Sequence, residues 1–280
     1  MADPSAPDPR PPVLREHLIK AHPDRDGAFR WRGDGVSRIE GLSDAVFGFA
    51  ITLLVVSLDA PRTFDELLAT LAGFPAFAAA FALLILVWVA QYRFFRRYGL
   101  EDGRTVVLNI ALLFLVVFFI YPLKFLSTTI VGLWLGVVGG VFGVPALLPQ
   151  ADAAYRSLDP TRWPLVMVIY GLGYAGVFAV FVLLHRHALA CADALELDAV
   201  ERPETRASAL EHAGHIGVAL ASVALTLGLA YGAGWPPAAA AGLGGFAYFL
   251  EWPTQVLLGR RLDVRRRALR AAPAPLPWPT

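Results

Sequence analysis

Charged residues and cysteines are scarce in this chain of 280 residues. Only 17% of the residues are charged and 56% are hydrophobic, whereas a soluble domain carries about 25% charged residues. This composition argues against a soluble globular protein. Cys191 is the only cysteine, which excludes an intrachain disulfide and a metal site built from cysteines. The formal net charge of +1 gives no indication of a nucleic-acid partner.

Motifs for catalysis are also missing. The sequence shows no Ser-His-Asp arrangement, no His-Glu-x-x-His motif, no P-loop and no dinucleotide-binding fingerprint. The glycine-rich run from 132 to 143 is apolar and lacks the Lys-Ser/Thr ending of a phosphate-binding loop, so we interpret it as packing surface. We therefore predict that the protein is not an enzyme, has no catalytic residues and needs no cofactor.

Four histidines occur in two close pairs, His185 with His187 and His212 with His215. The second pair has i,i+3 spacing and could hold a metal ion or titrate near neutral pH. Two ligands do not make a metal site, so we predict no bound metal and favour histidines at the membrane interface.

Long apolar runs dominate the sequence. Several of them reach roughly 18 to 25 residues, the length that a helix needs to cross a bilayer. The sequence therefore predicts an all-α, polytopic membrane protein. Six transmembrane helices fit best, at about 38–58, 66–92, 105–127, 163–188, 209–230 and 237–258.

Lysine and arginine are distributed unevenly around these spans. All but four of the 24 basic residues fall on one side. The exceptions are Arg62, Lys124, Arg156 and Arg162. By the positive-inside rule, both termini are cytoplasmic. We expect three regions: a mostly disordered cytoplasmic tail over 1–37, a six-helix membrane domain over 38–259, and an Arg- and Pro-rich cytoplasmic tail over 260–280.

The apolar, glycine-rich stretch from 128 to 148 leaves the number of spans open. As a seventh span, it would place the arginine-rich C-terminus outside the cell, against the charge bias. We favour an extension of the third span, or an interfacial or re-entrant piece, and assign 128–162 to the outer side.

Polar side chains lie at the start of the first span. Ser37-x-x-Glu40 is typical of a capping box, which starts a helix near Arg38. Ser43 and Asp44 would then lie inside the helix, although they could instead cap a helix that begins there. Arg38 and Asp44 are six residues apart and do not share a helix face. Their partners should therefore come from neighbouring helices or subunits.

Two neutral amides are candidate partners at the same depth. Gln91 ends the second span and Asn109 lies early in the third. A buried hydrogen bond is the better interpretation for both side chains, since lipid offers them no partner. We predict a structural polar network composed of Arg38, Ser43, Asp44, Gln91 and Asn109.

The first span resembles a known signature. Arg38-Ile-Glu-Gly-Leu42-Ser43-Asp44 is similar to the Arg-x-x-x-Phe-Ser-Asp motif that opens the first helix in the transmembrane protein 175 family. Leu42 stands where the family usually has Phe. This family comprises endosomal and lysosomal potassium channels and their prokaryotic relatives.

Two further motifs extend the resemblance over about 38–127. Trp88-x-x-Gln91, followed by Arg93 and Phe94, is similar to the second-helix Trp-Leu-x-His-His pattern, with Gln91 at a histidine position. Asn109 is similar to the third-helix asparagine of the family.

The resemblance implies a potassium-permeable cation channel with no Thr-Val-Gly-Tyr-Gly filter, a loop that this sequence also lacks. In the prokaryotic branch, four six-helix chains surround a pore lined by the first helix, with a hydrophobic constriction five residues after the Asp. That position holds Phe49, where the family typically has Ile. Phe49, Leu53 and Val56 follow i, i+4, i+7 spacing and form one stripe, with Thr52 beside it as the only polar member.

Two other functions remain as alternatives. One is a proton-coupled secondary transporter that uses Asp44 and Glu251 as proton carriers, and the other is a non-conducting membrane scaffold. A transporter should show an inverted repeat or broken helices near the bilayer midplane, and we find no clean internal repeat. The expected partners are K⁺ ions, the lipid bilayer and three further copies of the chain, in the plasma membrane.

Overall fold

The computed structural model describes residues 29–33, 35–56, 62–64, 67, 70, 71, 73–144, 152, 154, 156 and 159–250. Within these residues the regular secondary structure is helical, with no strand. The long helices are α1 (Arg38–Val56), α3 (Phe74–Tyr98), α4 (Gly103–Phe142), α6 (Trp163–Ala190) and α7 (Glu201–Leu227). The shorter ones are η2 (Pro160–Arg162), the π-helical turn η3 (Gly228–Gly232), α8 (Pro237–Phe246) and η4 (Ala247–Leu250).

Among the described residues, four segments are long and apolar enough to cross a membrane: α3, α4, α6, and α7 together with η3. The prediction of an all-helical polytopic membrane protein is confirmed at this level. The count of six spans and the side on which the termini lie stay predictions.

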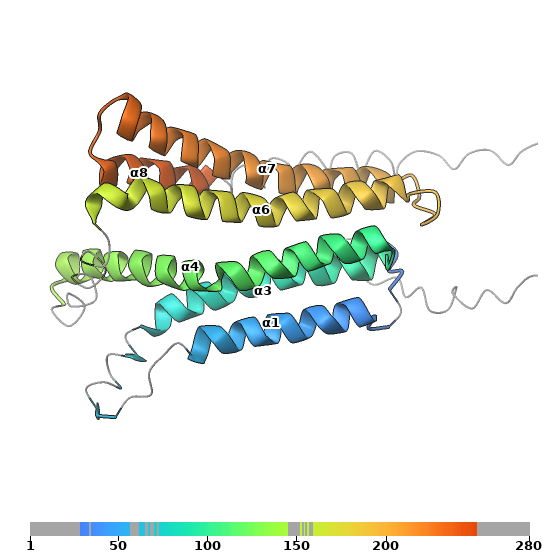
Figure 1. Ribbon diagram of the computed structural model, residues 1–280, viewed down its shortest axis with the longest axis horizontal. Coiled ribbons are helices and arrows are strands. Elements are labelled where there is room, and N and C mark those ends of the chain that lie inside the picture. The colour runs from blue at the N-terminus through green and yellow to red at the C-terminus, as the bar shows by residue number, and fades with distance from the viewer. Residues whose placement is uncertain are drawn as a thin grey trace, which may run out of the picture.

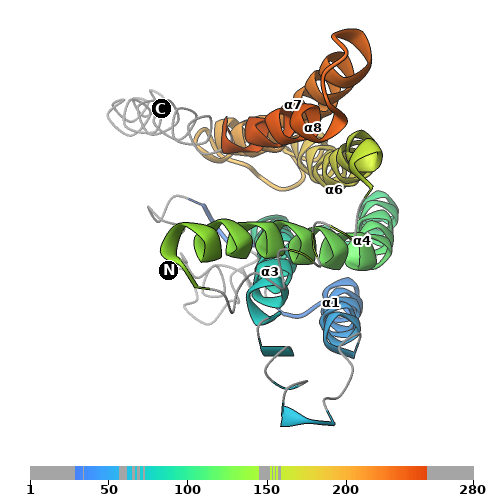
Figure 2. The ribbon, with the colours of Figure 1, turned by 90° about the vertical axis from the view of Figure 1, so that its left-hand side faces the viewer.

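The helices run side by side in two groups (Figures 1 and 2). One group holds α1, α3 and the first half of α4, and the other holds α6, α7 and α8. α4 packs against α1 and α3 on one side and against α6 on the other, so it joins the two groups. Large buried side chains from α1, α3, α4 and α6 form the common core: Phe47, Leu84, Phe94, Phe95, Leu112, Val116, Ile120, Phe181 and Leu184.

The second span lies later in the chain than expected. The helix begins at Phe74 instead of 66, because Gly73 occupies the N-cap and Pro75 stands in the first turn, where its missing N–H costs nothing. It continues to Tyr98, so Arg93, Arg96 and Arg97, which follow the expected end of the span at 92, lie in its last turns. Positive charge there stabilises the carboxyl end of a helix.

The other boundaries differ in detail. α6 agrees with the expected span to within a few residues, and α7 begins at Glu201, earlier than 209. The last span, expected over 237–258, is described only to 250. Glu251 and the C-terminal tail over 260–280 lie outside the described residues.

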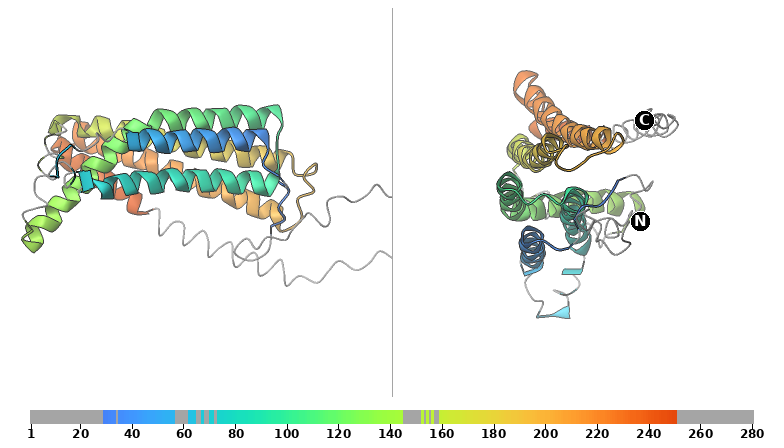
Figure 3. Two further views of the ribbon diagram at one scale, coloured as in Figure 1. Left: turned by 90° about the horizontal axis from the view of Figure 1, so that it is seen from below. Right: turned by 90° about the vertical axis from the view of Figure 1, so that its right-hand side faces the viewer.

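α4 is a continuous helix of 40 residues, not the span over 105–127 that we expected. It corresponds to an extension of the third span through the glycine-rich stretch. At about 1.5 Å per residue it is about 60 Å long, which is twice the roughly 30 Å hydrocarbon thickness. Pro122 lies inside it and removes one backbone hydrogen bond. The second half leaves the bundle obliquely (Figure 3, left).

Part of the expected N-terminal tail packs against the bundle. Phe29 is 1% exposed and packs edge-on against Tyr98, with ring centroids 5.5 Å apart. The backbone N–H of Arg32 donates to the carbonyl of Arg96 over 3.0 Å. A buried ring and backbone hydrogen bonds therefore hold residues 29–33, and the expectation of a mostly disordered tail over 1–37 stays a prediction. Residues 1–28 lie outside the described residues.

Replacing Gly99 with Ala should destabilise the protein. Gly99 ends α3 at φ +56°, and a Cβ there would lie 2.9 Å from the carbonyl oxygen of Arg32. A non-glycine residue in this left-handed conformation costs about 1–2 kcal/mol, and the contact adds to it. Gly103→Ala is the control, because nothing lies within 4 Å of its Cβ position. Thermal unfolding in detergent should show a lower midpoint for Gly99→Ala alone; equal midpoints would contradict the strain.

Candidate functional site

The start of α1 is held by a reciprocal pair of hydrogen bonds. The backbone N–H of Ser37 donates to Glu40 Oε2 over 2.9 Å, and the N–H of Glu40 donates to Ser37 Oγ over 3.1 Å. This confirms the predicted capping box. Ser43 and Asp44 lie within the helix, so their interpretation as a cap is wrong.

One turn further along, three helices meet through a buried chain of hydrogen bonds. Gln91 Nε2 on α3 donates to Asn109 Oδ1 on α4 over 2.6 Å. Asn109 Nδ2 donates to Ser43 Oγ on α1 over 2.9 Å, and Ser43 Oγ donates to the carbonyl of Ile39 over 2.8 Å. Ser43, Gln91 and Asn109 are at most 2% exposed. These hydrogen bonds fix the rotation of α1 against α3 and α4.

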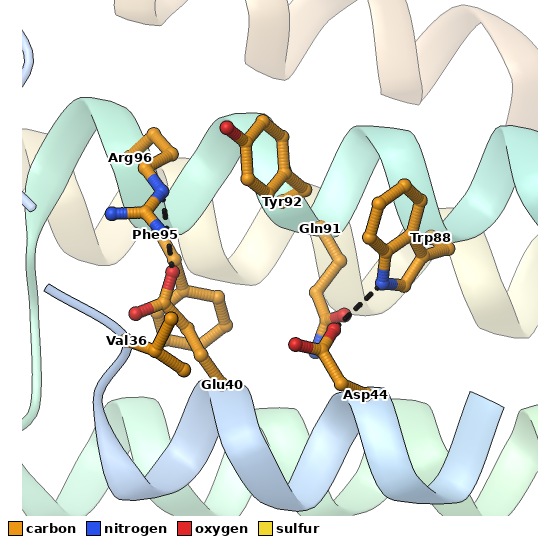
Figure 4. A pocket seen from close by; sticks show the side chains of 8 residues that line it. All are labelled: Val36, Glu40, Asp44, Trp88, Gln91, Tyr92, Phe95 and Arg96. Carbon is orange, nitrogen blue, oxygen red and sulfur yellow. Dashed lines mark hydrogen bonds and ion pairs between the residues drawn. The ribbon is translucent and has the colours of Figure 1, made fainter. Parts of the chain in front are cut away.

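Asp44 lies outside this buried chain. Its side chain is exposed, and Oδ1 accepts a hydrogen bond of 2.8 Å from Trp88 Nε1 on α3 (Figure 4). Trp88 stacks on Tyr92, with ring centroids 5.6 Å apart. Asp44 is therefore held at the edge of α1 by an aromatic pair on α3.

A groove of about 210 Å³ separates α1 and α3 at this point. Its charged lining residues are Glu40 and Asp44 on α1 and Arg96 on α3 (Figure 4). Arg96 Nε lies 3.8 Å from Glu40 Oε1, whereas Asp44 faces the opening with no cation of the described residues beside it. The groove thus carries one more negative than positive charge.

α1 presents a continuous exposed face. Leu42 is 51% exposed and Phe49 56% exposed, and the side chain of Thr52 is exposed as well. At about 100° per residue, the exposed positions form an arc with Thr52 near its centre. The hydroxyl of Thr52 donates to the carbonyl of Gly48 over 2.8 Å, so its oxygen lone pairs are directed away from the helix backbone.

The remaining predicted residues are placed as follows. The side chain of Arg38 is exposed, about 120° around the helix from Asp44. Leu53 is half-buried against the core and lies at the border of the exposed arc. The backbone of Val56 ends α1, but its side chain lies outside the described residues. The structure therefore brings together Ser43, Gln91 and Asn109, and leaves Arg38 on the surface of the single chain.

The histidines belong to a different region. His212 and His215 face α6, where His185 lies 5.0 Å from His212 between ring centroids. No group of three His, Cys, Asp or Glu side chains in the described part of the chain could hold a metal ion. These rings pack with aromatic residues of α6. Their location at the membrane interface stays a prediction.

His187 ties the start of α4 to the end of α6. Its Nε2 lies 2.9 Å from both carboxylate oxygens of Asp102. Partial burial raises the pKa of Asp102, but hydrogen bonds from Thr105, His187 and the backbone of Arg104 outweigh it and lower the pKa to about 2. Asp102 is therefore ionised at neutral pH.

Two site contacts were missed by the sequence reasoning. Trp88 was assigned to a motif but not to the polar network, and Glu40 was interpreted only as a cap. The indole N–H of Trp88 was the available signal, because Trp has one donor that a membrane helix must satisfy. The pairing of Glu40 with Arg96 had no signal in the spacing, since the two residues lie on different helices.

The chain is similar in sequence to known proteins. Residues 38–119 match the family described as endosomal/lysosomal potassium channel TMEM175. A protein named potassium channel from Marivirga tractuosa is 36% identical over 241 residues, which cover 86% of this chain and 93% of that protein. Another potassium channel, from Chamaesiphon minutus, is 28% identical over 201 residues, covering 68% and 83%.

A solved structure resembles most of this chain. It is the crystal structure of a variant of the potassium channel MtTMEM175 bound to a nanobody–MBP fusion protein. The two chains superpose with a TM-score of 0.71 at 35% sequence identity, covering 86% of this chain and 98% of the other. The likeness therefore includes the helices beyond residue 119.

Proposed function

Since the chain belongs to the endosomal/lysosomal potassium channel TMEM175 family, we propose that it is a potassium-permeable cation channel in which α1 lines the pore. The members found by comparison are potassium channels and not enzymes. Four copies of the chain would surround the pore, with no Thr-Val-Gly-Tyr-Gly filter.

The exposed face of α1 carries this proposal. The opposite face is fixed by the buried chain through Ser43, Asn109 and Gln91. α1 therefore has a defined rotation, and its free arc includes Phe49 and Thr52. In a membrane an apolar face of this kind contacts lipid, a neighbouring subunit or a pore. The polar side chain of Thr52 at the centre of the free arc favours a pore over lipid.

In the pore, Phe49 and Thr52 would have different roles. Four Phe49 rings would form a hydrophobic constriction that closes by dewetting. Thr52, near the centre of the arc, would direct its hydroxyl oxygen toward a passing cation. Leu53, also predicted to line the pore, would lie at the border of the exposed arc. Val56 remains a predicted lining residue, since its position on the helix falls between those of Thr52 and Phe49.

The two edges of the exposed arc support a ring of copies. Arg38 lies near the Phe49 edge, and Asp44 lies at the other edge beside the groove with surplus negative charge. Opposite charges on opposite edges of one helix pair in a head-to-tail arrangement, which forms a ring when the rotation between neighbouring copies closes. Arg38 of one copy would then reach Asp44 of the next, which completes the predicted network of Arg38, Ser43, Asp44, Gln91 and Asn109.

We further propose that the channel lies in the plasma membrane. It would have six spans, with both termini in the cytoplasm. The bias of basic residues toward one side supports this orientation. In this arrangement, residues 38–259 form the channel domain, and the turns after α3 and α6 face the cytoplasm. The oblique second half of α4 and residues up to 162 lie on the outer side.

Potassium flux tests the channel directly. Purified protein in potassium-loaded liposomes should dissipate the gradient, and a sodium gradient should dissipate more slowly. The oligomeric state is measured on the same sample. A folded tetramer with no flux above that of empty vesicles would reject the proposal.

Assembly should depend on the charges at the two edges of α1. Replacing Asp44 or Arg38 with Ala should reduce the tetramer yield more than the conduction of the assembled fraction. An unpaired charge left inside an interface costs about 3–5 kcal/mol. Arg93→Ala serves as control, since its exposed side chain lies on α3. Normal tetramer yield and thermal stability in both variants would contradict the pairing between copies.

A further inference from the structure

A short segment before α1 joins three parts of the molecule at one end of the bundle. We call residues 29–33 the strap; it lies beside the ends of α3 and α6 (Figure 1, dark blue). The N–H groups of Arg32 and Gly33 both donate to the carbonyl of Arg96, over 3.0 and 3.2 Å. The last carbonyls of a helix have no partner within it. The strap therefore supplies donors to a carbonyl at the C-terminal end of α3 that has no partner within the helix.

The contact between strap and α3 allows no side chain at two positions. A Cβ on Gly33 would lie 2.9 Å from the carbonyl oxygen of Phe95, and one on Gly99 would lie 2.9 Å from that of Arg32. Both neighbours are backbone atoms, which cannot turn aside as a flexible side chain can. The strap thus has one close-fitting position on α3.

A partly buried ion pair with the first residue of α7 fixes the other side of the strap beside the turn between α6 and α7, residues 191–200. Arg32 Nη2 lies 2.5 Å from Glu201 Oε2, and Nη1 lies 3.2 Å from Oε1. Glu201 is fully buried and also accepts from the backbone N–H of Arg30 over 2.9 Å and of Asp198 over 3.2 Å. Every lone-pair direction of this carboxylate is thus engaged by the strap or the turn.

The turn is shaped to receive the strap arginines. Arg32 Nε donates to the carbonyl of Leu195 over 2.7 Å. The carbonyl of Glu196 accepts from Arg30 over 3.1 Å and from Arg32 over 3.3 Å. Glu196 has φ +49°, the one positive value at a non-glycine residue among those described. Such a conformation persists only where its surroundings impose it.

The strap is also connected to the first turn of α1. Arg96 Nη1 donates to the carbonyls of Gly33 and Gly35, over 3.1 and 3.3 Å. The Nε of Arg96 lies 3.8 Å from Glu40, the capping-box residue of α1. A continuous set of contacts therefore runs from the α6–α7 turn through Arg32 and Arg96 to the start of the helix that we assign to the pore.

We propose that Arg32 and Glu201 are positioning residues for gating: through the strap, the α6–α7 turn holds the cytoplasmic end of α1 where the closed constriction forms. This inference rests on the proposed channel function. Neither residue touches the ion. When the ion pair is removed, the first turn of α1 is no longer held in one position. The tetramer then spends less time in the closed state, in which the four Phe49 rings are in contact.

Single-channel recording in planar bilayers tests this inference on the full-length protein. Arg32→Ala and Glu201→Gln should each raise the open probability by about tenfold or more, because a conformational equilibrium shifts by the free energy that the lost pair contributed to one state. Unitary conductance and potassium-to-sodium permeability should stay unchanged, since the pore wall is intact. Arg32→Lys keeps the charge and should restore most of the closed time.

Arg104→Ala is the matched control. Arg104 lies in the first turn of α4, at the same end of the bundle, and its side chain is exposed. The gating of this variant should equal that of the wild type. Wild-type gating in assembled Arg32→Ala and Glu201→Gln tetramers would overturn the positioning role. A wild-type protein that carries no current would instead reject the channel proposal.

Hydrogen exchange on the wild-type tetramer gives a readout that needs no variant, in case both variants fail to assemble. The amides of residues 32 and 33 should be protected as strongly as those of the second turn of α1, because the first N–H groups of a helix have no acceptor within it. Rapid exchange at residues 32 and 33, with α1 protected, would show that the strap does not hold the helix and would overturn the inference.

Discussion

Replacing Asn109 with Leu is expected to cause a large loss of stability. The amide is fully buried and joins Gln91 on α3 to Ser43 on α1. A leucine of similar size keeps the packing but leaves the Gln91 amide N–H₂ without its acceptor. A buried polar group left unpaired costs about 1–3 kcal/mol, and the lost donor to Ser43 adds to it. Thermal unfolding in detergent and tetramer yield should both fall.

The double variant Asn109→Leu/Gln91→Met separates the hydrogen bond from the shape of the side chains. Removing both partners leaves no unpaired amide, which is nearly neutral when shape is kept. The double variant should therefore be more stable than Asn109→Leu alone. Ser43 would still donate to the carbonyl of Ile39. If the loss of stability in the double variant equals the sum of the losses in Asn109→Leu and Gln91→Met, the two side chains do not stabilise the fold through their mutual hydrogen bond.

Replacing Phe49 with Ala should have the largest effect on conduction. In the proposed tetramer it removes four rings at once from the narrowest part of the pore, which favours a hydrated, open passage. A barrier lower by about 1.4 kcal/mol already gives a tenfold faster flux, so we expect at least about that increase. Liposome flux and single-channel conductance measure it. Phe49→Ile should lie between the wild type and Phe49→Ala.

Leu54→Val is the control for Phe49→Ala. Leu54 is 2% exposed and lies on the opposite, buried face of α1, so the loss of a methylene there should not widen the pore. Its flux should match that of the wild type once corrected for the amount of tetramer. Unchanged flux in an assembled Phe49→Ala tetramer would place the constriction at another ring and remove the reason for assigning it to Phe49.

Local sequence signals predicted the helix starts better than the helix lengths. The Ser37 and Glu40 pair placed the start of α1 correctly because a capping box acts within four residues. The start of α3 was misplaced, although Gly73 and Pro75 carried the signal, because the apolar run continues upstream of them. The end of α4 could not be placed by hydropathy, since the whole stretch through Phe142 is apolar.

The polar contacts of the site were also predicted only in part from the sequence. Depth along the span was enough to group Gln91 and Asn109 with Ser43, since amides buried in lipid must find each other. Spacing could not show that Arg38 and Asp44 remain on the surface of the single chain. It also could not show that Leu53 turns toward the core, because α1 is apolar on all sides around that position.

By itself, the sequence determined the membrane-embedded helical class, the side bias of the basic residues and the family, because hydropathy, charge and short motifs are local properties of the chain. Tertiary structure alone decided which face of α1 is free. That face is the one left over after the Ser43–Asn109–Gln91 chain and the core have fixed the opposite side. The ion pair between Arg32 and Glu201 likewise depends on the tertiary structure. Two residues so far apart in sequence meet only when the turn between α6 and α7 is folded against the end of α3.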